Sequence, residues 1–259
     1  MERAPLVLVD THAHLDQLED PLAEALRAAR RGVRCIVGVS MDMASGRTIR
    51  ELCRRLPGRI LPAFGLHPWS ISEETKEECL RFVEEHLGEA AAVGEVGLDY
   101  RIKTPKPLQK DVLERQLGMA AARQLPVILH CRLSHARVLS MVMAAGIRRA
   151  VFHWYSGPLE VLEEIVGNGY FISATPAVQY SPPHREAVSF APVGSLVLET
   201  DSPVEYRGTP SRPADVAEVC RAVALLKGLS AEEVAKATTE NALRLFGDRG
   251  DLKDPHPLS

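Results

Sequence analysis

Two histidines one residue apart, His12 and His14, directly follow the short apolar run Leu6–Val9. Because side chains alternate along an extended strand, both imidazoles point to the same side and can converge on one metal ion. The pair is equally consistent with polar strand-end residues that hydrogen-bond to a loop. The pair alone does not decide between a metal site and a structural role.

The same residue types recur where later apolar runs end. These residues are Glu95, His130, His153, Glu199 and Asp201. In a barrel of parallel strands, every strand opens onto the same face at its C-terminal end, so residues distant in sequence meet there. Imidazole and carboxylate ligands without thiolate suit Zn, Mn or Mg. The set exceeds what one tetrahedral ion needs, and a bridging Glu95 would join two divalent ions.

Short apolar runs alternate with helix-like segments along the whole chain. The predicted strands are Leu6–Val9, Cys35–Val39, Ile60–Phe64, Ala90–Val93, Val127–Leu129, Ala150–Phe152, Tyr170–Ile172 and Leu196–Leu198. The predicted helices are Pro21–Arg31, Ser45–Arg55, Glu73–His86, Leu108–Arg123, Ser134–Ala144, Pro158–Val166, Pro183–Phe190, Pro213–Leu226 and Ala231–Leu245. This alternation predicts an α/β fold, a single (β/α)8 TIM-type barrel with an extra C-terminal helix. The rival, an open doubly wound sheet, lacks its glycine-rich phosphate fingerprint after the first strand.

The barrel is expected to occupy residues 1–247, and the polar, proline-containing segment 248–259 is expected to be a flexible tail. The chain has 259 residues, a formal net charge of −3 and 46% hydrophobic residues, which excludes a disordered chain and a collagen-like one. A general DNA-coating protein would be strongly basic, so any contact with nucleic acid must come from a local patch.

The five cysteines are scattered and odd in number, which predicts reduced thiols in a cytoplasmic protein. No apolar run approaches the roughly 18 residues that span a membrane, and the start of the chain offers no secretion signal. No heptad or long amphipathic seam indicates an obligate protein partner.

The motifs that carry these residues resemble those of the TatD-type metal-dependent hydrolases of the amidohydrolase superfamily. The matching segments are Asp10-Thr-His12-Ala-His14-Leu-Asp16, Gly65-Leu-His67-Pro68, Gly94-Glu95-Val-Gly97-Leu98-Asp99-Tyr100, Leu129-His130-Cys-Arg132, His153-Trp-Tyr-Ser156-Gly157, Glu199-Thr-Asp201-Ser-Pro203 and Thr239-Glu-Asn241 with Leu-Phe246. They occur in the family's order, from Val9 to about Phe246.

The resemblance implies two divalent metal ions and assigns their ligands. One ion is held by His12, His14 and Asp201, the second by His130 and His153, and Glu95 bridges the two. Family members are described as magnesium-dependent deoxyribonucleases, several of which degrade single-stranded DNA from the 3′ end. The resemblance therefore implies hydrolysis of a phosphodiester. With a metal-activated water as the nucleophile, we expect Asp201, a ligand at the last strand, to accept the proton, and we expect Glu95 to be essential.

The sequence departs from many relatives after His153, where Trp154 and Tyr155 replace a Cys-Phe pair. These aromatic rings either stack on a nucleobase or pack between helices. Asn241, in the last helix, is expected to serve helix packing rather than catalysis.

Basic residues near the predicted metal face are candidates for binding a phosphate backbone. They are Arg132, beside His130, and Arg101 and Lys103 in the loop after Glu95. His67, at the end of the third strand, either contacts substrate or has a structural role. Glu199 is expected to hydrogen-bond to a ligand imidazole and orient it, and Asp99 either does the same or anchors its loop.

Three alternatives to a deoxyribonuclease remain open at this stage. The same dinuclear site could hydrolyse an ester or amide, for example a D-aminoacyl-tRNA. A cyclic amidase fits less well, because such relatives bridge their metals with a modified lysine on the fourth strand, where this chain has Glu95. The third alternative is a barrel that binds nucleic acid without turnover, and it would have no need of an activated water.

Overall fold

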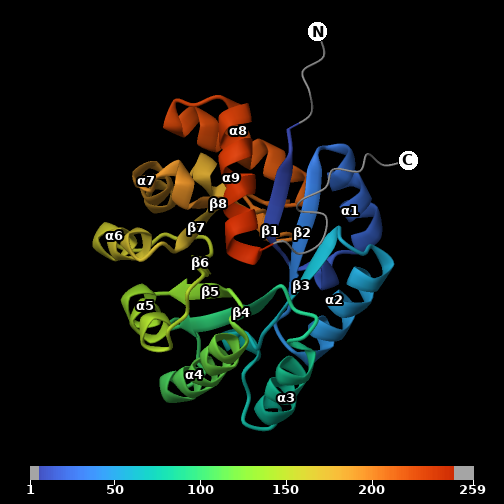
Figure 1. The fold of residues 1–259 in the computed structure, drawn as a ribbon, viewed down its shortest axis with the longest axis vertical. Helices are drawn as coiled ribbons and strands as arrows, with labels where there is room; N and C mark the ends of the chain where they lie inside the picture. Colours follow the sequence, from blue (N-terminus) through green and yellow to red (C-terminus); the bar gives the residue numbers. More distant parts are fainter. Residues whose placement is uncertain (1–5, 248–259) are drawn as a thin grey trace.

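The computed structural model describes residues 6–247, and these form a barrel of eight strands hydrogen-bonded in chain order (Figure 1). All neighbouring pairs in this sheet are parallel. The strands are β1 (Leu8–Ala13), β2 (Val33–Val39), β3 (Ile60–Phe64), β4 (Ala92–Asp99), β5 (Val127–Arg132), β6 (Ala150–Phe152), β7 (Phe171–Ala174) and β8 (Leu196–Leu198). The predicted tail 248–259 lies outside the described residues.

The segment after β8 closes the barrel against β1. The backbone N–H of Asp201 donates to the carbonyl of His12 at 2.9 Å, and the N–H of His14 donates to the carbonyl of Ser202 at 2.8 Å. The hydroxyl of Thr11 also donates to the carbonyl of Leu198 at 3.1 Å. The closing contacts therefore involve the same residues that were predicted to bind metal.

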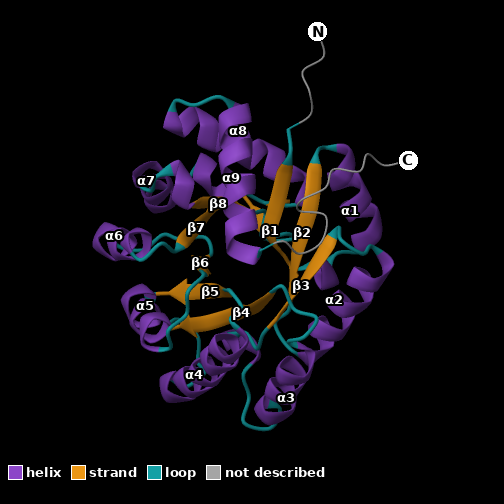
Figure 2. Cartoon of the chain, viewed as in Figure 1, coloured by secondary structure: helices purple, strands orange, loops and turns teal. Residues whose placement is uncertain are grey.

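Helices surround the strands on the outside of the barrel (Figure 2). They are α1 (Pro21–Arg30), α2 (Met43–Arg55), α3 (Lys76–His86), α4 (Lys106–Arg123), α5 (His135–Ala144), α6 (Leu159–Gly167), α7 (Pro182–Phe190), α8 (Val216–Lys227) and α9 (Ala231–Phe246). One helix follows each strand and α9 is additional, which confirms the predicted TIM-type barrel with an extra C-terminal helix. A small antiparallel hairpin, β9 (Glu205–Tyr206) with β10 (Thr209–Pro210), precedes α8 and was not predicted.

The N-terminal end of the barrel is apolar and is closed by α9. Alternate residues of β2, namely Cys35, Val37 and Val39, belong to one buried cluster with Leu245 and Phe246 of α9. The helix is fixed in place by side chains that bond strand starts: the Asn241 amide donates to the carbonyl of Leu196 at 2.6 Å, and the Thr239 hydroxyl donates to that of Val7 at 2.9 Å. Asn241 thus has the packing role expected from the sequence.

Five predicted strands differ from the structure: β2 begins two residues earlier than predicted, β7 is shifted to end two residues later, and β1, β4 and β5 were ended too early for one shared reason. The predictions ended β1 at Val9, β4 at Val93 and β5 at Leu129, where the apolar run stops. The actual strands continue to Ala13, Asp99 and Arg132. At the C-terminal end of a barrel the inward side chains are functional, so the strands there continue through polar residues.

Within residues 6–247, the structure contains no helix of the length and apolarity needed to cross a membrane.

Candidate metal centre

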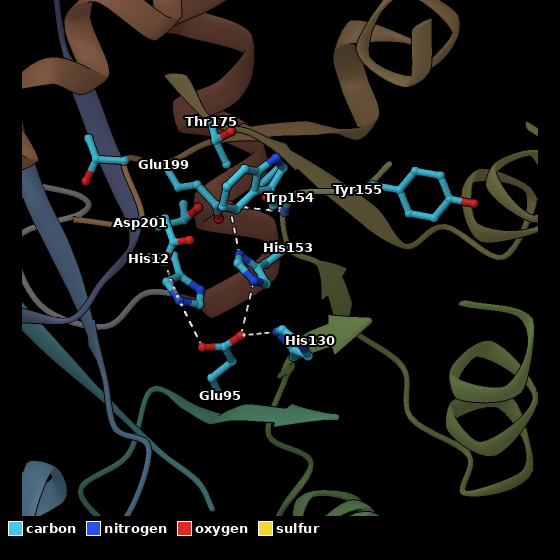
Figure 3. A network of polar contacts seen from close by, with 12 residues as sticks. His12, Glu95, His130, His153, Trp154, Tyr155, Thr175, Glu199 and Asp201 are labelled. Atoms are coloured by element: carbon cyan, nitrogen blue, oxygen red, sulfur yellow. Dashed lines mark hydrogen bonds and ion pairs between the residues drawn. The ribbon is translucent and has the colours of Figure 1, made fainter. Parts of the chain in front are cut away.

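The C-terminal ends of five strands bring the predicted ligands to one place (Figure 3). β1 supplies His12 and leads into His14, β4 supplies Glu95, and β5 supplies His130. His153 follows β6, and Asp201 lies three residues beyond the end of β8. These side chains are buried except for His130, which is half-buried. Positions far apart in the sequence therefore meet in a single polar cluster.

Four of these side chains surround one point with the spacing of a metal site. The Nε2 atoms of His12 and His14 lie 3.4 Å apart, and Glu95 Oε2 lies 3.2 Å and 3.4 Å from them. Asp201 Oδ1 lies 3.4 Å and 3.5 Å from the same two nitrogens. The corners of a tetrahedron around a cation bound at about 2.1 Å are about 3.4 Å apart. The donor set therefore fits a divalent cation.

A second set of nitrogens faces the other oxygen of Glu95. His130 Nδ1 and His153 Nε2 both lie 3.1 Å from Glu95 Oε1, and His67 Nε2 lies 3.5 Å from it. His67 is thus buried inside the cluster, where His67, Glu95 and His130 form a further group that could hold a metal ion. The Glu95 carboxylate lies between two nitrogen-rich sets, each facing one of its oxygens.

The electrostatic field of the cluster favours positive charge at the first set. Burial lowers the pKa of His14, but its bonds to Asp201 and Glu95 outweigh burial and raise that pKa to about 10. Burial raises the pKa of Glu95, but its interactions with the surrounding histidines outweigh burial and hold that pKa well below its usual range. Burial lowers the pKa of His67 to about 4, so that this imidazole is neutral and keeps a lone pair for a ligand.

Two acidic residues, as the sequence predicted, each contact the imidazole nitrogen that does not face Glu95. Glu199 Oε1 lies 3.1 Å from Nδ1 of His153, and Asp99 Oδ2 lies 3.3 Å from Nε2 of His130. A carboxylate behind a ligand imidazole fixes the ring and its tautomer. Asp99 also anchors its loop, because its Oδ1 accepts the N–H of Arg101 at 2.8 Å.

The local backbone is unusual around these residues. Leu133, Trp154 and Asp201 have φ values of 56°, 42° and 51°, in the left-handed region that non-glycine residues rarely adopt. Gly97 is needed for another reason: a Cβ there would lie 1.9 Å from the carbonyl oxygen of His130, its partner on β5. Strained conformations concentrated at one end of a barrel are typical of a functional site.

Comparison with known proteins agrees with this geometry. The model of the family described as "TatD related DNase" matches residues 9–247. The chain belongs to the TatD family.

Relatives of known sequence and structure match this TatD-family chain over nearly its full length. Deoxyribonuclease TATDN3 of Homo sapiens is 31% identical, with 95% of this chain and 97% of that protein covered. The uncharacterized metal-dependent hydrolase YabD of Bacillus subtilis is 33% identical over 93% of this chain and 99% of that protein. The crystal structure of the TatD homologue YjjV of Escherichia coli superposes with a TM-score of 0.83 at 30% identity, over 92% of this chain and 97% of the other.

A cleft of about 360 Å³ opens beside the polar cluster of this TatD-family hydrolase. His130 and His153 form part of its wall, together with Arg101 and Arg132. Of the basic residues predicted to bind substrate, these two are therefore next to the cluster. Lys103 is exposed on the loop between β4 and α4, and it is not among the described residues that line this cleft.

The aromatic residues after His153 have different environments. Trp154 lines the cleft, and its ring centroid lies 5.3 Å from that of Tyr206. Tyr155 is buried, contacts the His135 ring at 4.8 Å and donates its hydroxyl to the carbonyl of Pro158 at 2.6 Å. Figure 3 shows Tyr155 pointing away from the cluster. Of the two interpretations left open, packing applies to Tyr155, whereas Trp154 is placed to contact a ligand.

Sequence reasoning missed Trp69, which lies at the same rim. This tryptophan is 60% exposed, and its ring centroid is 5.1 Å from that of His67 and 5.9 Å from that of His130. The available signal was its position in the sequence, two residues after His67 in the Gly-x-His-Pro motif.

Proposed function

We propose that this TatD-family chain is a deoxyribonuclease that holds two divalent cations and removes nucleotides from the 3′ end of single-stranded DNA. The observation that carries the proposal is the placement of Glu95, whose two oxygens face separate sets of metal-binding atoms. The proposed ligands are His12, His14 and Asp201 for one cation, His130 and His153 for the other, and Glu95 for both. The names of relatives, which include a deoxyribonuclease and metal-dependent hydrolases, support the same activity.

The cations, Mg, Mn or Zn, would supply Lewis-acid activation of a water molecule and neutralise charge on the phosphate. The protein's own contribution begins with Asp201. Burial raises the pKa of Asp201, but its bond to His14 and the charge of His12 hold that pKa below its usual value. The carboxylate is therefore ionised near neutral pH and can accept the proton of the attacking water at Oδ1.

Arg101 and Arg132 supply fixed positive charge in the cleft next to the cluster. Two guanidinium groups there can hold the phosphodiester and offset the negative charge that develops on its oxygens during attack. Their position explains how a chain of net charge −3 can bind a polyanion, because the local charge sets the field inside a cleft.

Glu199 and Asp99 keep the imidazoles of His153 and His130 in one orientation, through the contacts at 3.1 Å and 3.3 Å. Both contacts lie on the far side of the imidazole from Glu95. Each ring thus presents one nitrogen to the centre and the other to a carboxylate, which fixes its tautomer.

The chain's cysteines support a cytoplasmic location. All five lie within the described residues and none of them forms a disulfide there, as is usual for proteins of a reducing compartment.

The test is release of mononucleotides from single-stranded DNA labelled at either end, with Mg²⁺, Mn²⁺ or EDTA. We expect metal-dependent release of a 3′ label as the first product, while a 5′-labelled strand shortens stepwise. Glu95→Ala and the isosteric Glu95→Gln should both abolish release. Glu160→Gln, an exposed residue on α6, is the matched control and should cleave like the wild type.

If protein that is shown by elemental analysis to carry metal releases no nucleotide, the proposal of deoxyribonuclease activity is wrong. A parallel assay with D-aminoacyl-tRNA distinguishes the remaining hydrolase activity at the same centre. DNA binding without hydrolysis of either substrate would instead indicate a barrel that binds nucleic acid without turnover.

A further inference from the structure

Trp69 is an exposed aromatic side chain at the rim of the metal-binding cluster. It lies in the turn formed by residues 68–70 after β3, and 60% of its surface is exposed. Leaving a large apolar ring in water forgoes the free energy that its burial would provide. Single exposed apolar residues are common on protein surfaces, so the case for a ligand contact depends on the position of this ring at the mouth of the site and on its fixed orientation.

Three contacts fix the orientation of the exposed indole. Its Nε1–H donates to Asp99 Oδ2 at 2.8 Å. Its plane is nearly perpendicular to the rings of His67 and His130, at 88° and 72°. A ring held in this way loses little conformational entropy when a flat partner stacks on it, because its orientation is already fixed before the ligand binds.

The same carboxylate connects the indole to the cluster and to the basic cleft. Asp99 Oδ2 also contacts His130 at 3.3 Å, and Asp99 Oδ1 accepts the backbone N–H of Arg101 at 2.8 Å. Asp99 thus contacts a proposed metal ligand and an exposed aromatic ring, and it accepts the backbone N–H of an arginine that is proposed to bind phosphate. A nucleotide presents a phosphate and a flat base a short distance apart, and these groups match the arginine and the ring.

We propose that Trp69 is a specificity-determining residue, a stacking platform for an unpaired nucleobase next to the scissile phosphate. This inference rests on the proposed function and adds a residue that selects the substrate. Bases inside a duplex are already paired and stacked, whereas an unpaired base can place its face against an aromatic side chain. Trp69 therefore favours single-stranded ends over paired ones.

The position of Trp69 separates it from other aromatic residues. Phe190 is also exposed, at 48%, but it ends α7 and precedes β8, which puts it near the N-terminal end of the barrel. Trp154 lines the cleft but is only half-buried and already contacts Tyr206. Phe190 is consequently a matched control: it is exposed and aromatic, but remote from the cluster.

The first experiment compares KM and kcat for single-stranded oligonucleotides that carry one abasic nucleotide at successive positions near the cleaved end. For the wild type, we expect one abasic position to raise KM about tenfold, the size of one stacked base. Trp69→Ala should raise KM for the intact oligonucleotide by a similar factor and remove the discrimination at that position. Phe190→Ala should retain it.

The variant Trp69→Phe distinguishes stacking from support of the metal centre. It keeps an aromatic face but loses the Nε1–H bond to Asp99. If Trp69 stacks on a base, Trp69→Phe keeps KM within about threefold of the wild type, because phenyl rings also stack. If Trp69 merely holds Asp99 and His130 in place, Trp69→Phe and Trp69→Ala lose kcat equally at unchanged KM, which overturns the proposal.

Tryptophan fluorescence gives a readout that does not need turnover. The chain has two tryptophans, so Trp154→Phe leaves Trp69 as the sole emitter. In EDTA, which prevents cleavage, we expect an intact oligonucleotide to quench this emission and the critical abasic oligonucleotide to quench it much less. An oligonucleotide that binds, as measured by the anisotropy of its own label, without quenching Trp69 overturns the stacking role.

The two proposals fail in different ways. Cleavage of DNA with an unchanged KM in Trp69→Ala overturns the stacking role and leaves the deoxyribonuclease intact. If the Trp69 emission is quenched in a base-dependent way but no metal supports cleavage, the proposed deoxyribonuclease activity is wrong and the stacking role of Trp69 is supported. If neither quenching nor cleavage is observed, both proposals are wrong.

Discussion

The two ends of the barrel are built by the same eight strands but hold opposite kinds of side chains. At the C-terminal end, imidazoles and carboxylates crowd together: His12 Nε2 lies 3.2 Å from Glu95 Oε2 and 3.4 Å from Asp201 Oδ1. At the N-terminal end, Leu245 and Phe246 of α9 pack against the apolar residues of the strands. One end concentrates polar groups whose mutual positions matter for chemistry, and the other buries apolar surface.

This difference indicates that binding of metal and stability of the fold are largely separate in this molecule. Apolar burial at one end stabilises the barrel, so the other end can keep strained backbone at Trp154 and Asp201 and a crowded polar cluster. The separation can be tested from both ends of the barrel.

Removal of metal should have the largest effect on activity. Chelation by EDTA is expected to abolish hydrolysis and to leave the secondary structure intact, because the apolar end does not depend on a cation. Saturation with metal at about 100 times its dissociation constant should stabilise the fold by about 3 kcal/mol. Circular dichroism and thermal denaturation with and without metal measure both effects. Unfolding by EDTA at 25 °C would show that the two ends are not separate.

Asp201→Asn should lower kcat by about 10²- to 10⁴-fold, the usual contribution of a proton acceptor. The amide keeps an oxygen for a cation but cannot take a proton from water. Steady-state kinetics together with metal content by elemental analysis check this prediction. Asp111→Asn, an exposed residue on α4, serves as the control. Near-normal turnover of Asp201→Asn with metal bound would show that another group accepts the proton.

Phe246→Ala tests the opposite end of the barrel. Phe246 is 1% exposed inside the apolar cluster, so its truncation should cost about 3–5 kcal/mol of unfolding free energy. Turnover per folded molecule should stay close to that of the wild type, since the residue is far from the cluster. Denaturant titration and kinetics on the same preparation measure the two quantities. A large drop in kcat would indicate coupling between the ends.

Glu199→Gln should have the smallest effect of the four. The amide can still contact Nδ1 of His153, now 3.1 Å from Glu199 Oε1, but without a negative charge. We expect metal affinity to fall about 10- to 100-fold, as for other carboxylates behind ligand imidazoles. Metal titration followed by activity recovery measures the loss. Unchanged affinity would limit Glu199 to its second contact, the 3.1 Å bond from the N–H of Trp154.

The sequence was most informative where apolar patterning is regular. β3 (Ile60–Phe64), β6 (Ala150–Phe152) and β8 (Leu196–Leu198) have the predicted bounds, because each is an apolar run with clear ends. The helices were predicted to within a few residues for the same reason, apart from Pro213–Leu226, which divides into a 3-10 turn (Pro213–Asp215) and α8. Their amphipathic faces repeat with the helical period.

Hydrophobicity failed where strands carry functional side chains. In β1 and β4, polar residues such as His12 and Glu95 lie inside the strand, because the barrel interior at that end is lined by the polar cluster. The β9–β10 hairpin was missed because its turn combines Arg207 and Gly208, both with positive φ, and only the glycine is a usual signal for that conformation.

The sequence by itself determined the barrel, the family and the residues that were candidates for metal binding, because ligand types at strand ends and an alternating pattern are local features. Only the tertiary structure decided which atoms face each other. It placed one Glu95 oxygen toward His14 and the other toward His130, buried His67 in the cluster, and left Trp69 exposed beside it. Such relations depend on strand register and barrel closure, which bring together residues whose spacing along the chain carries no record of their distance in space.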